Sequence, residues 1–457
     1  MLGGEAQTVE MAARTLQNLC SGYGYDLIDT PALESPDLFL RKSGGETASH
    51  IYSFTDPGGR PVSLRPEFTA SVIRGYLQGG PRRLPLRWQY RGPVFQYVGD
   101  GSPNRQFTQL GAELIGASGP LADAEVLSLS LEGLRRLGLN GYRVTLGHMG
   151  ISSQWLGDLG LSERLRLFLV SRLGELGQGP DGRNRVEEEL RQQGLGHGES
   201  TGPRTRKRSE DRQALLRTLV QDMAPELQGG RTPEEIVSRF LARSEARDKP
   251  ESVARGLSLT QELVQVKGDA PSALASARQI ARKYGADQSL LDELDELLSL
   301  IAQVGLCEGI SVDLGLARGL AYYTGVVFEV RHPGQPAGPS ICGGGRYDSL
   351  VRSLGGSDDV PALGFAYCLE RLCGALALEG VPLSTPAPQV VLMCPGSESA
   401  RGATMKAAQA MRADGLRVQV ELSVLSTEEC LVAARRRGMA RAVVVAEDGE
   451  VQEHVLD

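Results

Sequence analysis

The residues of this sequence best placed to hold a small polar ligand are a glutamine and a glutamate in one predicted strand. They are Gln109 and Glu113, in the segment RQFTQLGAELIG at residues 105–116. In a strand they share one face with Arg105 and Phe107. Burying them on an apolar, glycine-lined surface is costly unless they meet a polar ligand or partner. The spacing therefore predicts one shared pocket.

Three further segments carry polar groups that such a pocket could use. SLRPEFT at 63–69 sets Glu67 and Thr69 on one side of an extended segment. GLARGLAYYTGVVFE follows at 315–329, and CGGGRYD at 342–348 precedes LGFAYCLERL at 363–372. Each segment alone has a plainer interpretation, since a lone glutamate is usually a surface residue and GGGR can be a tight turn. Their order within one chain is what indicates a site.

Taken in order, the segments resemble those of histidyl-tRNA synthetases, which are class II aminoacyl-tRNA synthetases. The matching patterns are LRPE-x-T, RQF-x-Q-x-G-x-E-x-x-G, RGL-x-YYT, GGRYD-x-L and GF-x-x-x-LERL. RGL-x-YYT is particular to the histidyl branch, so the resemblance is specific. It covers most of residues 5–150 and 310–457 and leaves the stretch between them largely outside.

The resemblance implies a pocket for L-histidine. Glu67, Thr69 and Gln109 would hold the α-ammonium group of the ligand. Glu113 and Tyr323 would read the imidazole, with the carboxylate accepting a hydrogen bond from a ring N–H. All of these assignments come from the family and are expectations for this chain.

The same resemblance assigns the remaining pocket residues. Arg318 would face the α-carboxylate, where a guanidinium can bind through two hydrogen bonds. Tyr322 and Tyr347 would wall the histidine pocket, and Arg371 would hold the γ-phosphate of ATP. If the chain is an active ligase, Arg318 and Arg105 are the expected catalytic residues, and Arg105 also joins the ATP site.

One departure from the family bears on the chemical step. Class II synthetases carry a Phe-Arg-x-Glu pattern after the first strand of motif 2, and this chain has FQYV at 95–98. Gln96 donates a hydrogen bond but supplies no charge at the α-phosphate. Removing one such preorganised donor typically costs on the order of 10²–10³ in rate. Arg91 lies too far back to replace it, whereas Arg105 could approach from the opposite strand.

A second group shares this core, the non-aminoacylating regulatory subunit of ATP phosphoribosyltransferase in histidine biosynthesis. LRPEFTASVIR, GAELIGASGPLADAEVL, VTLGHMGI and VDLGLARGLAYYTGVVFE are similar to that group. Ala321, where ligases carry an acid, also departs from the ligase pattern. The tail domain and the long insertion are untypical of the regulatory group.

Three functions therefore stay open, and we favour a histidine-binding regulatory subunit partnered by a catalytic phosphoribosyltransferase chain. The first alternative is an active histidine–tRNA ligase that uses ATP, Mg²⁺ and tRNA(His). The last is a paralogue acting as an RNA- or protein-binding module. None of them requires a tightly bound cofactor or a protein-held metal.

The pattern of elements predicts an α+β fold with a six- or seven-stranded antiparallel sheet flanked by helices. We expect a first core part at 1–160, a helical insertion at 161–305, a second core part at 306–380 and an anticodon-binding-like α/β domain at 389–457. Helices are predicted at 5–20 and 121–137, a strand broken at Pro31, and a hairpin turn at 56–59. The first helix and the kinked strand match motif 1, which implies a homodimer.

Composition excludes several other classes of protein. In 457 residues with a net charge of −7, no run approaches the roughly 18 apolar residues of a membrane span, and the N-terminal segment has no secretory pattern. The seven cysteines are scattered without a CxxC pair. We therefore expect reduced thiols and a cytoplasmic protein. The basic run 204–208 is expected to be a solvated loop, and the arginines at 435–437 to favour a helix C-terminus.

Overall fold

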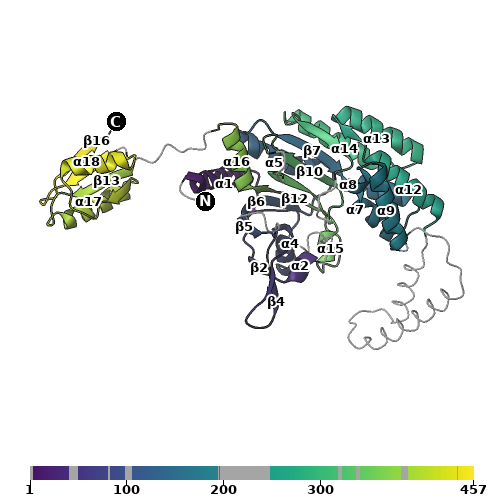
Figure 1. The fold of residues 1–457 in the computed structure, drawn as a ribbon, viewed down its shortest axis with the longest axis horizontal. Helices are drawn as coiled ribbons and strands as arrows, with labels where there is room; N and C mark the ends of the chain where they lie inside the picture. Colours follow the sequence, from purple (N-terminus) through teal and green to yellow (C-terminus); the bar gives the residue numbers. More distant parts are fainter. Residues whose placement is uncertain are drawn as a thin grey trace. The chain divides into compact units, whose positions relative to one another are not determined.

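The structure is a computed structural model that describes residues 4–40, 50–80, 83–97, 105–193, 195, 248–316, 322–335, 340–381, 390–439 and 441–456. The chain forms two compact units, Met1–Val381 and Pro382–Asp457 (Figure 1). We call them the large unit and the tail unit. Arg318, Ala321 and the basic run 204–208 lie outside the described residues.

A nine-stranded sheet forms the centre of the large unit, in the order β1-β5-β6-β12-β11-β10-β7-β9-β8. Its strands are β1 (Asp26–Leu27), β5 (Leu86–Phe95), β6 (Gln106–Ile115), β7 (Arg143–His148), β8 (Lys267–Gly268), β9 (Ile310–Asp313), β10 (Val326–Arg331), β11 (Cys342–Arg346) and β12 (Ala362–Cys368). β1 with β5 and β7 with β9 are parallel pairs, and the other pairs are antiparallel.

The prediction of six or seven strands, all antiparallel, was therefore wrong in two respects. β1 lies within the strand predicted to break at Pro31, whereas β8 has only two residues and is too short to show an alternating pattern. β8 also comes from the stretch predicted as an all-helical insertion. Its pairing with β9 joins that stretch to the sheet edge.

Three helices pack on the strands that carry motif 2. They are α1 (Gly4–Gly22), α5 (Pro120–Arg136) and α16 (Leu369–Leu378), which contact β5, β6 and β12 (Figure 1). The helix predicted at 5–20 is confirmed, and the apolar residues that recur along it at helical spacing are all buried: Val9, Ala12, Ala13, Leu16 and Leu19. This apolar layer covers one face of the sheet.

A small three-stranded sheet precedes the site. It contains β2 (Leu33–Glu34), β3 (Ser53–Thr55) and β4 (Pro61–Leu64), in the order β2-β4-β3. The predicted hairpin turn is present, and the Asp56 side chain closes it by accepting from the backbone N–H of Arg60. The break at Pro31 separates β1 from β2, which belong to different sheets. The short helix α2 (Pro36–Leu40), which follows β2 in the chain, contacts β4 and α4 (Thr69–Gln78).

The stretch predicted as a helical insertion, 161–305, is mainly helical in its described part and also contains β8. Its described helices are α7 (Glu163–Ser171), α8 (Leu173–Leu176), α9 (Pro180–Gln192), α12 (Pro250–Leu263), α13 (Ala270–Tyr284) and α14 (Ser289–Gln303), and α6 (Met149–Asp158) precedes them. The helices α7, α9, α12 and α13 gather beside one end of the central sheet (Figure 1). A short helix, α15 (Leu350–Ser353), follows the GGGRYD segment and packs on α4.

The tail unit alternates strands and helices. Its elements are β13 (Val390–Pro395), α17 (Arg401–Ala413), β14 (Arg417–Val420), α18 (Thr427–Arg436), β15 (Arg441–Val445) and β16 (Val451–Val455). β13 runs parallel to β14 and β15, as the alternating pattern predicts. β16 was not predicted and adds an antiparallel edge strand.

A disulfide in the tail unit corrects the expectation of reduced thiols throughout. Cys394 on β13 and Cys430 on α18 are joined across 36 positions of sequence. Both lie fully buried in the apolar layer between the sheet and α18. The sequence has no spacing signal for this pair, because only the packing of α18 on β13 brings the two sulfur atoms together.

Candidate functional site

A cavity of about 330 Å³ opens beside the central sheet of the large unit. Its walls come from the segment after β4, from β5, β6 and the strands on either side of β11, and from α16. The predicted site residues that line it are Glu67, Thr69, Gln96, Gln109, Tyr322, Tyr323, Tyr347 and Arg371. Segments that are far apart in the sequence thus meet at one place.

Glu113 is not among the residues that line the cavity; it lies behind Thr69, Tyr90 and Tyr347, which line it and whose three hydroxyl groups hold its carboxyl group. The Thr69 hydroxyl donates to its Oε1 at 2.8 Å, and the Tyr90 hydroxyl donates to the same atom at 3.1 Å. The Tyr347 hydroxyl donates to Oε2. Glu113 is 1% exposed, and burial raises its pKa to about 7 although the three hydrogen bonds act in the opposite direction. These three hydroxyl donors stabilise the ionised form of the Glu113 carboxyl group.

Tyr90 is a site residue that sequence reasoning missed. It pairs with Gly111 across β5 and β6, so its ring lies over a position without a side chain. A Cβ atom at Gly111 would lie 2.5 Å from the Tyr90 hydroxyl oxygen. The glycine in RQFTQLGAELIG was the available signal, because a glycine inside a strand often marks a close approach.

Glycine also makes room for the carboxylate itself. A Cβ atom at Gly364 on β12 would lie 1.6 Å from Glu113 Oε2. At Gly345 on β11, it would lie 2.9 Å from the Tyr323 ring. CGGGR is therefore a buried strand and no tight turn. Arg346 at its end is structural, because it pairs with Asp123 at 2.8 Å.

Glu67 and Gln109 bring unused acceptor capacity to the cavity. The Glu67 carboxylate accepts from the backbone N–H of Ala70 at 3.1 and 3.3 Å, at the start of α4. Burial raises the pKa of Glu67 to about 7. The Oε1 atom of Gln109 is buried and has no hydrogen-bond partner among the described residues. These acceptors suit a ligand that brings several N–H donors, such as an ammonium group and an imidazole.

Two arginines also line the cavity. Arg371 donates to the Ser340 carbonyl oxygen at 3.3 Å, and its guanidinium lies 5.0 Å from the centre of the Phe107 ring. Arg331 pairs with Glu329 at 2.9 Å, and Glu329 lines the cavity as well. Arg371, whose described contacts are uncharged, is the arginine better suited to an anionic group.

The side chain at the motif 2 arginine position, Gln96, is uncharged. Gln96 donates from Nε2 to the Pro66 carbonyl oxygen at 3.0 Å, so its amide joins β5 to the LRPE segment. Arg105 is exposed, with its guanidinium 5.7 Å from the centre of the Tyr97 ring, and is not among the residues lining the cavity. Arg91 pairs with Glu10 on α1. The catalytic and ATP-binding assignment of Arg105 stays a prediction.

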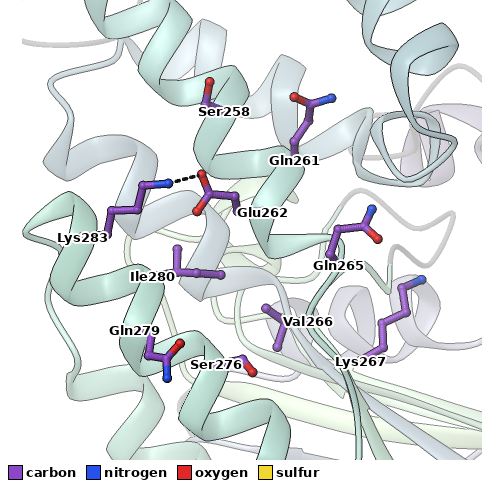
Figure 2. Close-up of a pocket in the computed structure, with 10 residues that line it drawn as sticks. All are labelled: Ser258, Gln261, Glu262, Gln265, Val266, Lys267, Ser276, Gln279, Ile280 and Lys283. Atoms are coloured by element: carbon purple, nitrogen blue, oxygen red, sulfur yellow. Dashed lines mark hydrogen bonds and ion pairs between the residues drawn. The ribbon is translucent and has the colours of Figure 1, made fainter.

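A second hollow, of about 580 Å³, lies between α12 and α13 (Figure 2). Its cations are already paired: Lys283 contacts Glu262 at 2.6 Å, and Lys267 contacts Asp313 at 3.1 Å. None of the site residues predicted from the sequence lines it. We therefore place the candidate site in the cavity beside Glu113.

The described residues contain neither a metal-binding cluster nor a membrane-spanning helix. Across these ranges, no group of three or more histidine, cysteine, aspartate or glutamate side chains is arranged to hold a metal ion. Among the described helices, none combines the length and apolar character needed to cross a membrane.

The mainly antiparallel sheet, its covering helices and the α/β tail unit define the class II aminoacyl-tRNA synthetase fold. Among solved structures, an ATP phosphoribosyltransferase regulatory subunit/histidyl-tRNA synthetase from Bacillus halodurans superposes with a TM-score of 0.66. The match covers 97% of this chain and 96% of that one at 23% identity, so it supports the fold alone.

Sequence comparison identifies the family. The family model described as histidyl-tRNA synthetase matches residues 1–175 and 216–372. The histidine–tRNA ligase of Pyrococcus horikoshii is 30% identical over 451 residues, covering 96% of this chain and 88% of the relative. That of Synechocystis is 32% identical over 441 residues, covering 93% and 78%. The chain belongs to the histidyl-tRNA synthetase family.

Proposed function

We propose that the cavity binds L-histidine. The observation that carries this proposal is the buried Glu113 carboxyl group, held by three hydroxyls beside the unused acceptors of Glu67 and Gln109. A histidine imidazole would donate an N–H to Glu113, and its α-ammonium group would meet Glu67, Thr69 and Gln109. Tyr322, Tyr323 and Tyr347 would enclose the ring. Arg318 would receive the α-carboxylate, as the family resemblance implies.

We further propose that the chain is a histidine–tRNA ligase. The relatives of that name match it over more than 90% of its length, tail unit included. In the reaction, a histidine carboxylate oxygen attacks the α-phosphorus of ATP and pyrophosphate leaves. A tRNA(His) hydroxyl then attacks the carbonyl carbon of the histidyl-adenylate, and AMP leaves. Arg371 is suited to hold the phosphates of ATP, and Mg²⁺ is usually held largely by such phosphates. This function was our alternative from sequence, and the relatives favour it.

The regulatory subunit of ATP phosphoribosyltransferase is the second candidate function. The replacement of the motif 2 arginine by Gln96 favours it, since the Gln96 amide is engaged with Pro66 and brings no charge to the α-phosphate. In this function, histidine would be a feedback signal and a catalytic phosphoribosyltransferase chain would be the partner.

Histidine-dependent exchange of pyrophosphate into ATP separates the two functions. Exchange by the unmodified protein would establish that adenylate forms without the arginine, as the ligase proposal requires. If histidine binds by calorimetry but no exchange occurs, the ligase proposal fails and the regulatory function takes its place. A Gln96→Arg variant tests the cause, because it should raise a weak exchange rate by roughly 10²-fold. Aminoacylation of tRNA(His) completes the test.

We also propose a homodimer located in the cytoplasm. Support for the dimer comes from the match of α1 and the broken strand at Pro31 to motif 1, and Leu27 and Leu33 of that strand are exposed. Light scattering should give at least twice the chain mass of 49.0 kDa. A monomer at working concentration would contradict the dimer.

A further inference from the structure

Arg65 is a buried arginine two positions before Glu67, and the proposed function gives it no role. It is 3% exposed. Its Nε donates to the Pro93 carbonyl oxygen at 2.8 Å, and its Nη1 donates to the carbonyl oxygen of Thr30 at 2.5 Å and to the Thr30 hydroxyl at 3.2 Å. All three acceptors are uncharged. A guanidinium is an expensive group to bury against carbonyl groups, so its position calls for an explanation.

Two neighbours enclose the guanidinium. It lies 3.8 Å from the centre of the Phe68 ring. Gly92 lies at the edge of this stack, where an added Cβ would lie 2.5 Å from Arg65 Nη2 and 2.9 Å from Phe68 Cζ. A planar guanidinium stacks on an aromatic ring, and an ammonium group cannot reproduce that contact. The space left beside Gly92 therefore suits an arginine stacked on Phe68.

This stack continues to the floor of the cavity. The Phe68 ring lies parallel to the Tyr90 ring, with 4.4 Å between the ring centres and 9° between the planes. The Tyr90 hydroxyl donates to Glu113. A chain of direct contacts thus runs from Arg65 through two rings to the carboxyl group.

The backbone around Arg65 is tied to the same neighbours. Its N–H donates to the Ala32 carbonyl oxygen at 2.9 Å, and its own carbonyl oxygen accepts from the Phe95 N–H at 3.0 Å. With the side-chain bonds to Thr30 and Pro93, these contacts attach the LRPE segment to the chain before β2 and to the end of β5. Glu67 and Thr69 follow directly on that segment.

We propose that Arg65 is the positioning residue of the histidine cavity. The hydrogen bonds of its guanidinium hold the segment that carries Glu67 and Thr69. Its stacking on Phe68, which in turn stacks on Tyr90, positions the Tyr90 hydroxyl that donates to Glu113. The proposal rests on histidine binding in this cavity. Arg65 itself does not line the cavity, so it acts through these residues and touches no ligand.

Two variants test the proposal by independent routes in the full-length protein. Arg65→Lys keeps the positive charge but loses the guanidinium hydrogen bonds and the stacking on Phe68. Gly92→Ala keeps Arg65, but its added methyl group displaces the guanidinium. Each should weaken histidine binding by roughly 10- to 100-fold, because small misplacements in a preorganised site have effects of this size. Two matched controls, Arg60→Lys on the exposed hairpin and Gly75→Ala in open space on α4, should bind as the parent does.

The pH dependence of histidine binding distinguishes positioning from general support of the fold. Loss of the Tyr90 hydrogen bond removes a contact that lowers the pKa of Glu113. Both variants should therefore move the pH midpoint of histidine binding upward, with calorimetry run from about pH 6 to about pH 8.5. Weaker binding with an unmoved midpoint in both variants would overturn the proposal, because it indicates only a loosened structure.

The remaining outcomes are also decisive. If the unmodified protein binds histidine and Gly92→Ala binds it equally well at every pH, the positioning role is wrong and the proposed function stands. If the unmodified protein binds no histidine, the proposed function fails first and the inference fails with it. Thermal unfolding of each variant identifies one that does not fold. Should Arg65→Lys be that variant, the result for Gly92→Ala decides.

Discussion

The large unit and the tail unit differ in how they treat buried polar groups. In the large unit, the Glu113 carboxyl group accepts hydrogen bonds from one threonine and two tyrosines, and burial raises its pKa. In the described part of the tail unit, the core clusters are apolar around a disulfide, and the buried Thr404 hydroxyl donates within its own helix. Among the described residues, the large unit brings an unpartnered buried atom, Gln109 Oε1, to a cavity, whereas the corresponding atom of the tail unit, His454 Nε2, lies on the edge strand β16.

The largest expected effect concerns the disulfide. Replacing both cysteines, Cys394→Ala with Cys430→Ala, should lower the unfolding free energy of the tail unit by about 3–4 kcal/mol, because a bridge across 36 positions restricts the unfolded chain. The large unit should be unaffected. Hydrogen exchange resolved by peptide measures the tail unit, while the fluorescence of Trp88 and Trp155 measures only the large unit. Equal loss in both units would contradict their independence.

The next effect is on binding. Glu113→Gln should weaken histidine binding at least roughly 100-fold, about 3 kcal/mol, because the imidazole N–H loses a charged acceptor. Stability of the large unit should stay the same or rise, since an unfavourably buried acid is removed. Calorimetry and urea unfolding measure the two quantities. The control is Glu125→Gln, which removes the partner of Arg87 outside the cavity. Unchanged histidine affinity in Glu113→Gln would remove our assignment of the pocket.

Two glycine substitutions compare the units directly. Gly364→Ala should lower the unfolding free energy of the large unit by about 2 kcal/mol, because its Cβ would overlap the Glu113 carboxylate. A Cβ added at Gly402 on α17 would meet nothing within 4 Å, so Gly402→Ala should raise the unfolding free energy of the tail unit by about 0.5 kcal/mol. Urea unfolding of each variant tests both signs. A neutral Gly364→Ala would show that the carboxylate is not tightly enclosed.

The smallest effect is a dependence on pH. The pKa of Glu113 is raised to about 7 from an ordinary value of 4.5, so the folded protein binds the extra proton between these values. Its contribution to stability is fully present below about pH 4.5 and is lost as the pH rises through 7. The slope should be at most about 1 kcal/mol per pH unit. Glu113→Gln should remove this part of the slope from the ligand-free protein, whereas Glu67, whose pKa burial also raises to about 7, keeps its own part. An identical slope in the variant would assign the effect to other groups.

Much of the large unit could be predicted from local patterns. The helix α1 and the hairpin at β3 and β4 follow from periodicity and turn residues. The shared face of Gln109 and Glu113 follows from strand geometry alone; Gln109 lines the cavity, and Glu113 lies behind Thr69, Tyr90 and Tyr347, which line it. Tyr90 was missed because a tyrosine in a strand is common in any core, and only its pairing with Gly111 distinguishes it.

The remaining features depend on tertiary contacts that the sequence does not show. The disulfide requires α18 to lie on β13, and β8 joins the sheet through only two residues. The hydrogen bond from Gln96 to Pro66 is likewise visible only when β5 and the LRPE segment are placed together. Local patterns therefore predicted which elements form, and long-range packing decided how the site is completed.

The glycines around the cavity limit how its ligand preference can change during evolution. Gly343 and Gly364 line the cavity, and Gly345 lies under the Tyr323 ring. Every mutation at these positions adds atoms, so through them the cavity can only shrink. Trimming Tyr90 or Tyr347 to admit a larger amino acid would give up a donor to Glu113. At these two tyrosines, a gain in size is thus coupled to a weaker hold on the acid proposed to recognise the imidazole.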